Sequence, residues 1–426
     1  MPQNFCEIMS KRGFVEWCSN ADELGAKMER EMVTGYVGFD PSSDSLHVGN
    51  MVPIMGLAWL QRFGHKPISL AGGGTGLIGD PSGKTKERQL LSVELAAHNL
   101  TCIKKQLSRF LDFDCGENSA LMPNNYDWLS KISFIEFLRD TGKYFPMNTL
   151  INRDYVRSRI DDPDKGITYT EMSYILLQAY DFCHMYNTMN CSLQMGGNDQ
   201  QGNIIGGIDL IRRRSGGQAY GLTFQLLLTA AGTKFGKSED GAVYLDPDKT
   251  SPYKFYQFWI NTDDRDIERL HKIYSFTSLE DIEELTGRHA AHPERREAQK
   301  ALAWDMTVRV HGADVASRVN DASAVLFGER EVRSADRALL DMLSAEIPTC
   351  DIASPLPIPL IEGLVASGGI SSKGEGRRKV REGGIYLNGE RVTDEARAIT
   401  SDDLLPGGYA QIRVGKKDFR LVRFNR

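Results

Sequence analysis

The sequence of 426 residues predicts an α/β fold: a domain with an open parallel sheet, then an α-helical domain and a small α+β module. Strand-like runs at 34–39 and 68–71 are joined by one helical stretch, and a strand, helix, strand order with short connections implies parallel strands. From Pro252 to about residue 330 the apolar spacing is helical, without strand-like alternation. An Asn-Gly pair at 388–389 then indicates a hairpin.

The first junction runs from a strand through a polar turn into a helix. Residues 34–39 alternate small and β-prone side chains, Asp40-Pro41 ends that pattern, and apolar residues recur at helical spacing over 46–60. In an open α/β sheet such a junction lies at the carboxyl end of a strand, where ligands bind and helix N–H groups are free for phosphate. His47 and Asn50 share one face of the first helical turn. An ordinary capping histidine is the alternative interpretation.

A second strand, 68–71, enters a glycine cluster. The glycines within 74–79 satisfy the dinucleotide-binding spacing, so NAD binding has to be considered. That fingerprint requires its third glycine to lie within an opening helix. The run Asp-Pro-Ser-Gly at 80–83 follows at once and cannot continue a helix, which argues against NAD binding. A Walker A loop is excluded because Ile78 stands where it needs glycine. We interpret these glycines as letting backbone approach a ligand closely, ahead of a cationic loop at 84–88.

The stretch 171–186 predicts a helix that is apolar around most of its circumference, which implies burial on several sides. Tyr174, Gln178 and Asp181 fall at i, i+4 and i+7 and form a single polar stripe. On an exposed helix such a stripe is simply the solvated face. If it lines a buried pocket instead, the Asp181 carboxylate requires a hydrogen-bond donor, because an unpaired buried charge is costly.

Two further stretches place polar residues after strand-like runs. Residues 193–203 run from a strand through a glycine turn into a helix with Asn198 or Asp199 as its cap. Residues 222–229 lead to a loop, 233–238, with two lysines around a Phe-Gly pair. Lysines there could stabilise a polyanion whose charge grows during a reaction. An exposed cationic turn is the alternative.

The cysteine count, the apolar runs and the charge distribution exclude some classes of protein and favour others. The seven cysteines are odd in number and form no Cys-x-x-Cys pair, which argues against a disulfide framework and against structural zinc, and we expect no protein-bound metal. No apolar run reaches membrane-spanning length and no signal or transit pattern is present, so we expect a cytoplasmic protein without membrane contact. The net charge is −6, but residues 355–426 carry +4, an asymmetry typical of a basic nucleic-acid-binding module.

Taken together, two of these stretches resemble the paired signatures of class I aminoacyl-tRNA synthetases. His47-Val48-Gly49-Asn50 resembles His-x-Gly-His, with Asn50 as the departure, and residues 234–238 match Lys-x-x-Lys-Ser/Thr. Residues 38–45 and 76–84 resemble tyrosyl-tRNA synthetases of the bacterial type, and the resemblance runs through nearly the whole chain. Gln201 is a second departure, because the family usually has tryptophan there.

The resemblance implies a tyrosine–tRNA ligase that activates tyrosine with ATP to tyrosyl-adenylate and transfers the tyrosyl group to the 3'-terminal adenosine of tRNA(Tyr). Mg²⁺ would accompany ATP without protein ligands, and the protein would be a homodimer. Catalytic roles would fall to His47, Asn50, Lys84, Arg88, Lys234 and Lys237. Tyrosine would be bound by Tyr36, Asp80, Tyr174, Gln178, Asp181 and Gln200, and ATP by Gly38, Asp40, His47, Asn50, Asp199, Lys234, Lys237 and Ser238.

The pattern along the chain sets the expected domain boundaries, with the linker ending at the proline-rich run 354–359, and the resemblance implies what each domain would do. The expected domains are a Rossmann-like catalytic domain at 1–235, a signature loop and anticodon-side helical domain at 236–330, a linker at 331–354 and a small RNA-binding module at 355–426. The basic residues expected on RNA phosphates are Lys373, Arg377, Arg378 and Lys379.

Three rival functions remain at the level of the sequence. A cytidylyltransferase-like enzyme shares the first signature but has no evident use for the terminal module. A tryptophanyl-type synthetase is the nearest relative, although Tyr36 and Asp181 favour a phenol over an indole. A non-catalytic RNA-binding protein on a synthetase fold would be expected to lose signature residues, whereas His47, Lys234 and Lys237 are all present.

Overall fold

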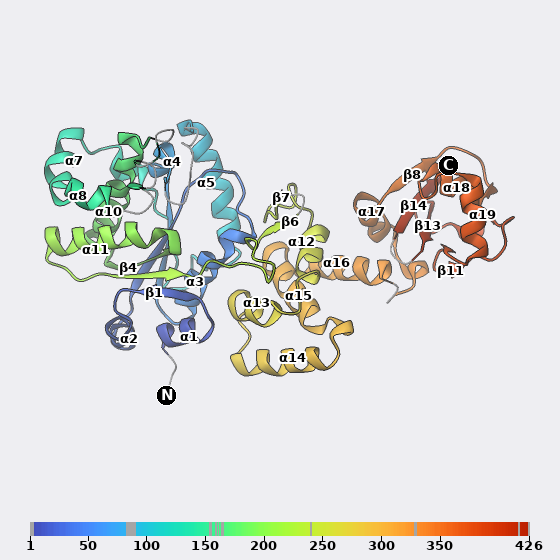
Figure 1. Cartoon of the computed structure of the whole chain (residues 1–426), viewed down its shortest axis with the longest axis horizontal. Coiled ribbons are helices and arrows are strands. Elements are labelled where there is room, and N and C mark those ends of the chain that lie inside the picture. Colours follow the sequence, from blue (N-terminus) through green and yellow to red (C-terminus); the bar gives the residue numbers. More distant parts are fainter. Residues whose placement is uncertain are drawn as a thin grey trace. The chain divides into compact units, whose positions relative to one another are not determined.

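The computed structural model describes residues 4–81, 91–152, 156–157, 160, 162, 166–238, 241–327, 330–415 and 418–424, and for residues 237–238 it describes the backbone alone. The chain divides into two compact units, each treated by itself below (Figure 1). The first contains residues 1–250 and 258–310, and the second contains residues 251–257 and 311–426.

A five-stranded sheet with the order β1-β5-β4-β2-β3 forms the centre of the first unit. The strands β2 to β5 are parallel, as the sequence predicts, and β1 pairs antiparallel with β5 at one edge. The strands are β1 (Val15–Cys18), β2 (Thr34–Phe39), β3 (Lys66–Ala71), β4 (Cys191–Gly197) and β5 (Tyr220–Phe224).

Helices cover both faces of this sheet (Figure 1). A Cβ atom added at Gly35 of β2 would meet the Leu60 side chain of α3 (Met51–Arg62). The next residue, Tyr36, has its ring centroid 5.4 Å from that of Phe182 in α10 (Tyr169–Met189). Because successive strand residues point to opposite faces, α3 covers one face and α10 covers the other, with α11 (Gln201–Ser215) packed beside it.

The strand order reverses between β2 and β4. From β2 the chain passes through η1 (Val48–Asn50) and α3 to β3, and from β4 it passes through η3 (Asn198–Gln200) and α11 to β5, in the opposite direction along the sheet. Diverging connections leave a crevice beyond the carboxyl ends of these strands, which is the ligand site of open α/β sheets. The fold therefore brings the two polar junctions of the sequence to one place.

The remaining elements of the first unit are mainly helices, and the helical region predicted after Pro252 is confirmed. No helix among the described residues is long and apolar enough to cross a membrane. These elements are α1 (Phe5–Lys11), α2 (Ala21–Arg30), α4 (Thr75–Ile78), α5 (Val93–Leu107), α6 (Tyr126–Leu129), α7 (Phe134–Asp140), η2 (Gly142–Tyr144), α8 (Met147–Ile151), β6 (Lys237–Ser238), β7 (Gly241–Ala242), α13 (Ile267–Tyr274), α14 (Leu279–Ala291), η4 (Pro293–Arg295) and α15 (Glu297–His311).

The second unit has a mixed sheet with the order β11-β10-β13-β14-β8, in which β8 alone is parallel to its neighbour. Asn388 and Gly389 have positive φ angles of 51° and 87°, as a two-residue hairpin turn requires, so the Asn-Gly hairpin is confirmed. The elements are α16 (Ala313–Leu326), η5 (Val332–Ser334), α17 (Arg337–Glu346), β8 (Thr349–Ile352), β9 (Ile358–Pro359), α18 (Leu360–Ala366), α19 (Lys373–Arg381), β10 (Ile385–Leu387), β11 (Glu390–Arg391), β12 (Ala398–Ile399), η6 (Ser401–Asp403), β13 (Tyr409–Val414) and β14 (Asp418–Phe424), and α12 (Pro252–Ile260) is shared with the first unit.

Some local predictions differ from the structure. The lead-in before Thr34 contains the edge strand β1 as well as helices, because four residues are too few to show an alternating pattern. The cap of α11 is Gln200 rather than Asn198 or Asp199, since these residues first form η3.

The segment 331–354, expected to be a linker, is folded in the structure. It contains α17 and β8, and Leu340 and Leu343 of α17 are completely buried in an apolar cluster with Leu421 of β14. The segment therefore contributes to the core of the second unit, and a boundary at 355 would divide one sheet.

Candidate active site

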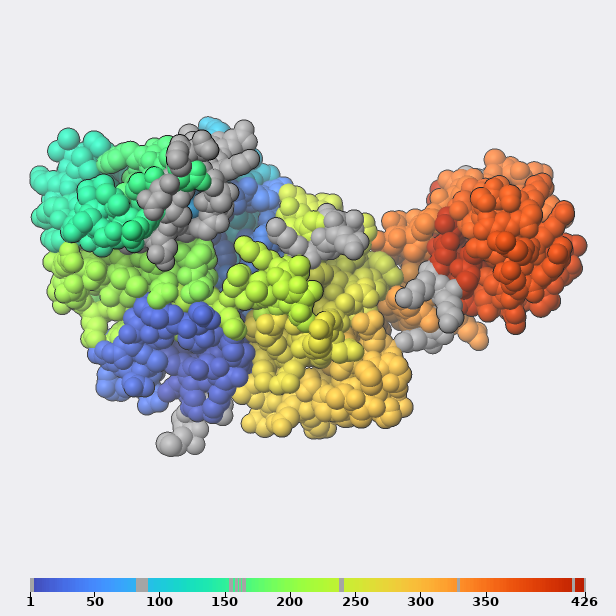
Figure 2. Space-filling view, in the orientation of Figure 1, coloured from blue at the N-terminus to red at the C-terminus, as the bar shows by residue number. Residues whose placement is uncertain are grey.

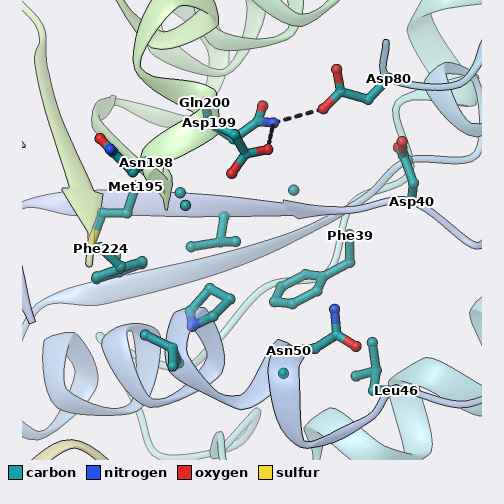
Figure 3. Close-up of a pocket in the computed structure, with 18 of the residues that line it drawn as sticks. Phe39, Asp40, Leu46, Asn50, Asp80, Met195, Asn198, Asp199, Gln200 and Phe224 are labelled. Carbon is teal, nitrogen blue, oxygen red and sulfur yellow. Dashed lines mark hydrogen bonds between the residues drawn. The ribbon is translucent and has the colours of Figure 1, made fainter. Parts of the chain in front are cut away.

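A cavity of about 800 Å³ lies where the strand order reverses (Figure 3). Its walls come from the ends of β2, β4 and β5 and from the segments that follow them. Figure 3 shows Asn50 on one side of the strands, as drawn, and Asp80, Asp199 and Gln200 on the other. Gly38 lies on this wall, and a Cβ atom added there would meet no heavy atom within 4 Å, so β2 leaves backbone open to a ligand.

The first signature begins the helix after β2. The backbone N–H of His47 donates to Oδ1 of Asn50 at 3.0 Å, within a capping box around η1. Because Oδ1 accepts this bond, the amide is assigned with Nδ2 as its free donor, and Asn50 lines the cavity. Asparagine at this position therefore serves both to start the helix and to present an N–H donor.

The second signature lies directly against the first. Gly236 has a φ of +92°, and a Cβ atom added to it would lie 2.6 Å from the backbone nitrogen of Gly49. The N–H of Val48 donates to the carbonyl of Val243 at 2.8 Å, and the N–H of Val243 donates to the carbonyl of Gly236 at 3.1 Å. Lys234 lines the cavity, so the structure brings Lys234 to His47 and Asn50. Lys237 and Ser238 enter β6.

A second group of polar residues surrounds Asp40. Its Oδ2 accepts from the Tyr174 hydroxyl at 3.2 Å, and its Oδ1 accepts from the Thr75 hydroxyl at 3.0 Å. Burial raises the pKa of Tyr174 well above its usual value, and the charges of Asp40 and Asp80 raise it further. Tyr174 therefore remains a neutral hydrogen-bond donor. Its hydrogen bond joins Asp40, which is expected to contact ATP, to a residue that is expected to contact tyrosine.

Gln200 joins two carboxylates at the cavity wall. Its Nε2 donates to Oδ2 of Asp80 at 2.7 Å and to Oδ2 of Asp199 at 2.8 Å (Figure 3). Its Oε1 accepts from Nε2 of Gln178 at 3.2 Å, and Oε1 of Gln178 accepts from Asn203 at 2.9 Å. These side chains come from three separate segments of the chain and form one connected network, with a carboxylate-rich region that suits a cation.

The innermost carboxylate is Asp181, which is 1% exposed. It accepts from Nδ2 of Asn125 at 2.8 Å and from Nε1 of Trp128 at 2.7 Å. Burial raises the pKa of Asp181 to about 7, although these two hydrogen bonds lower it. The hydrogen-bond donors that a buried Asp181 needs are thus provided by the protein itself. About two further lone-pair sites on the Asp181 oxygens remain for a ligand.

Tyr36 lies beside Asp181 in the cavity wall. Its hydroxyl is buried, and no hydrogen-bond partner for it is found among the described residues. Burial raises the pKa of Tyr36, and repulsion from the Asp181 charge adds to the effect, so the hydroxyl keeps its proton. An unsatisfied buried donor next to a carboxylate is a place for one oxygen that both accepts and donates a hydrogen bond.

Sequence reasoning did not identify Thr75, Asn125 and Trp128. Asn125 is completely buried, donates to Thr75 Oγ1 at 2.9 Å and accepts from the N–H of Gly74 at 2.7 Å. It connects the glycine cluster to Asp181, but its own neighbourhood in the sequence has no periodic signal. Lys84 and Arg88 lie outside the described residues.

Comparison with known proteins gives the family. Residues 28–328 match the tRNA synthetases class I (W and Y), and residues 340–422 match the tyrosine--tRNA ligase SYY-like C-terminal domain. A tyrosine--tRNA ligase of Anaeromyxobacter dehalogenans (strain 2CP-1) is 48% identical over 423 residues, which is 99% of either chain. The chain belongs to the bacterial-type tyrosyl-tRNA synthetases of class I. The family predicted from the two signatures and from residues 38–45 and 76–84 is therefore confirmed.

Other members of the family agree in sequence and in structure. The tyrosine--tRNA ligase of Roseiflexus castenholzii (strain DSM 13941 / HLO8) is 48% identical over 408 residues, 95% of this chain and 96% of its own. The crystal structure of a C-terminally truncated mitochondrial tyrosyl-tRNA synthetase of Aspergillus nidulans superimposes with a TM-score of 0.69 and 29% identity, covering 76% of this chain and 94% of that one. The synthetase fold predicted for the first unit is confirmed.

The second unit carries the basic helix α19 within the matched C-terminal domain. Lys373 lies 2.6 Å from Glu362, Lys379 lies 3.4 Å from Glu375, and Arg378 lies 3.8 Å from Glu382. Arg377 is exposed. The pairs of Lys373 and Arg378 are exposed, and exposed ion pairs contribute about 1 kcal/mol or less, so a phosphate can displace their carboxylates.

Proposed function

We propose that this chain is a tyrosine–tRNA ligase, which forms tyrosyl-adenylate from tyrosine and ATP and then transfers the tyrosyl group to the 3'-terminal adenosine of tRNA(Tyr). One observation carries the proposal: the two signatures contact each other at the wall of a cavity. The inner end of the same cavity holds Asp181 and Tyr36. A nucleotide region and a phenol region are thus parts of one cavity.

In the first step, a carboxylate oxygen of tyrosine attacks the α-phosphorus of ATP, and the bond to pyrophosphate breaks. In the second step, a ribose hydroxyl of the tRNA attacks the tyrosyl carbonyl, and AMP leaves. The protein supplies position and charge stabilisation. His47 and Asn50 hold the phosphate and ribose region, Asp199 meets the ribose, and Gly38 lets ATP approach β2. Charge on the leaving pyrophosphate is stabilised by Lys84, Arg88, Lys234 and Lys237, and Ser238 completes the ATP site.

The amino group of tyrosine is a cation and requires carboxylates and neutral acceptors. Asp80, Tyr174 and Gln178 provide them, and the hydrogen bond from Gln200 to Asp80 at 2.7 Å holds that carboxylate in place. Gln200 also supports the reacting carboxyl group. Asp40 orients Tyr174 through the hydrogen bond between them.

The phenol of tyrosine is recognised by Tyr36 and Asp181. The Tyr36 hydroxyl donates to the substrate oxygen, and the substrate hydroxyl donates to the Asp181 carboxylate. Phenylalanine would leave the Tyr36 hydroxyl without a partner, at a cost of about 1–3 kcal/mol, while Asp181 would keep only the hydrogen bonds from Asn125 and Trp128. This arrangement also disfavours an indole and therefore the tryptophanyl alternative.

Mg²⁺ enters this proposal as the counterion of the ATP phosphates and not as a protein-bound metal. The carboxylates of Asp40, Asp80 and Asp199 are hydrogen bonded to Tyr174 and Gln200, so their donor set suits an ammonium group better than a fixed divalent ion. Lysines around the pyrophosphate carry out part of the same charge neutralisation.

The protein is further proposed to act in the cytoplasm as a homodimer. Support for the dimer is an apolar surface on α7, α8 and the start of α10, where Phe134, Ile135, Met147 and Tyr169 are each more than half exposed. Residues 134–151 lie at the surface in Figure 2, at the upper left in teal, next to an apolar cavity of about 740 Å³. A second copy of the chain would cover this surface.

The test is ATP–pyrophosphate exchange with tyrosine, phenylalanine or tryptophan as the amino acid. We expect exchange with tyrosine alone and a 10- to 100-fold loss in Asp181→Ala, roughly the effect of removing a hydrogen bond to a charged group. Asp209→Ala, an exposed carboxylate on α11, is the matched control and should behave as wild type. Absence of exchange with any amino acid would leave an RNA-binding protein as the better hypothesis.

A further inference from the structure

The Lys234 side chain is carried by a small hairpin, residues 227–235, whose tip is exposed. Leu228 and Lys234 face each other as an antiparallel pair, and the N–H of Phe235 donates to the carbonyl of Leu227 at 3.0 Å. At the tip, the N–H of Thr229 donates to the carbonyl of Thr233 at 2.7 Å. These bonds hold the hairpin together, but they do not fix its position above the cavity.

Two charged side chains of helix α13 do fix that position. Asp266 is 5% exposed, and its Oδ2 accepts from the backbone N–H of Ala230 at 2.8 Å. The Arg269 guanidinium donates to Oδ1 of Asp266 at 2.8 Å and to the carbonyl of Leu228. Arg269 therefore binds the hairpin at the residue that faces Lys234.

The position of Asp266 argues against a purely local role. It is the residue that precedes α13, where a carboxylate usually accepts from the helix N–H groups, yet its side chain makes no capping hydrogen bond. Both of its oxygens are directed instead to the hairpin and to Arg269. The helix thus forgoes a cap in favour of contacts with the hairpin.

An aromatic contact continues the same interface. Phe235, 8% exposed, follows Lys234 and packs against Tyr274 at the end of α13, with ring centroids 5.8 Å apart, and against Trp259 at 5.7 Å. Beyond Phe235 the chain reaches Gly236 and its contact with Gly49. The hairpin is therefore fixed to α13 on both sides of Lys234 before it meets the first signature.

We propose that Asp266 and Arg269 are positioning residues for the activation step: they hold the hairpin so that the Lys234 ammonium reaches the leaving pyrophosphate. The inference rests on the proposed function, because it requires that Lys234 acts on this group. A small displacement of a charge from the transition state can lower a rate about 100-fold without weakening ground-state binding. Loss of the clamp should therefore slow adenylate formation and leave tyrosine binding intact.

The experiment is single-turnover formation of tyrosyl-adenylate by wild type, Arg269→Ala, Arg269→Lys and Asp266→Asn. We expect Arg269→Ala to lower the rate constant about 10- to 100-fold with little change in the KM for tyrosine, and Arg269→Lys to recover part of it. Arg265→Ala is the matched control, since Arg265 lies in the turn just before α13 but pairs with Asp263. Its rate should equal that of wild type.

A double-mutant cycle separates positioning from general stabilisation. In a Lys234→Ala background, Arg269→Ala should cause little further loss, because the group it positions is absent. Additive losses in the cycle would overturn the inference, and so would an unchanged rate in folded Arg269→Ala and Asp266→Asn. In either case, activity of the wild type with tyrosine would still support the proposed function. If a variant melts early, the remaining variants and the cycle still decide. Failure of the proposed function is recognised separately, by a wild type without exchange.

Discussion

Asp181 combines almost complete burial with an ionisable group, and its two neutral donors only partly offset the cost of the charge. Because burial raises its pKa to about 7, the folded protein holds a proton there between about pH 4 and pH 7, where the unfolded chain does not. The stabilisation from this group is full below about pH 4 and is lost as the pH rises through 7. If substrate binding needs the ionised carboxylate of Asp181, the site lowers the free energy of unfolding at neutral pH.

The change Asp181→Asn should remove this dependence. We expect the variant to be more stable than wild type at pH 8, by at most about 4 kcal/mol, and to lose that advantage toward pH 4. Melting temperatures of both proteins, measured from pH 4 to pH 8, check the difference. A difference that does not vary with pH would show that Asp181 titrates in the folded protein as it does in the unfolded chain.

Gly236 is a second residue whose identity follows from geometry. Gly236→Ala would place a methyl group 2.6 Å from the Gly49 nitrogen and should separate the signatures, so we expect about a 100-fold slower adenylate formation. Gly232→Ala is the matched control, because Gly232 lies in the adjoining hairpin with a φ of +79°, but a Cβ atom added there meets no atom within 4 Å. Similar rates for both variants would mean that backbone strain and not contact sets the rate.

At the scale of residues, sequence reasoning recovered the groups that stand in motifs and missed those that only folding brings together. His47, Asn50 and Lys234 were identifiable because each sits in a short pattern, and all three line the cavity. Asn125 and Trp128 contact Asp181 across more than 50 positions of sequence, and nothing local marks them. Long-range polar networks leave no periodic signal in the chain.

At the scale of elements, patterns long enough to repeat were predictable. The helix predicted at 171–186 is observed at Tyr169–Met189. Its polar stripe lines the cavity, which is the buried-pocket alternative and not the solvated face. In contrast, β1 has only four residues, and β8 is an edge strand that is partly exposed. Short elements whose order comes from pairing partners far along the chain cannot be read from their own composition.

Helix α19 is the element on which RNA affinity should depend. Replacing Lys373, Arg377, Arg378 and Lys379 by alanine should weaken tRNA(Tyr) binding and lower the slope of log affinity against log salt by about 3 to 4, roughly one for each lost phosphate contact. Titration of the tRNA at several salt concentrations measures this slope.

Two controls accompany that measurement. Arg423→Ala, which removes a cation of β14 that pairs with Asp351 of β8, should leave the slope near that of wild type. Tyrosine-dependent pyrophosphate exchange should be unchanged in the α19 variant, because α19 belongs to the second unit and the cavity to the first. An unchanged slope would assign the RNA contacts to another surface.

At the scale of the whole molecule, the proposed homodimer would form through the apolar surface of α7 and α8. Ile135→Asp places a charge where a side chain is 70% exposed, so we expect it to convert the dimer to monomers at micromolar concentration. Val93→Asp, at an exposed apolar position of α5, is the control and should remain dimeric. Sedimentation velocity gives the masses, and a monomeric wild type or a dimeric Ile135→Asp would contradict the proposal.

The division into two units also shows what could be predicted for the chain as a whole. The fold class and the family were predictable from the signatures and from the order of elements, and both are confirmed. The boundary near residue 355 was placed at a run of prolines, which suggests a connection between domains. The structure instead has α17 and β8 folded into the second unit ahead of that run, because the leucines of α17 and Ile352 of β8 share apolar clusters with buried residues of β13 and β14.

The parallel pairing of β8 with β14 has a consequence for how the second unit can be handled. β8 covers the N–H and C=O groups along one side of β14, whose Leu421, Val422 and Phe424 are buried. A fragment starting at 355 would leave this edge open, and open apolar edges recruit strands from other chains. β8 thus protects the unit from aggregation, and a soluble recombinant fragment should begin ahead of α17.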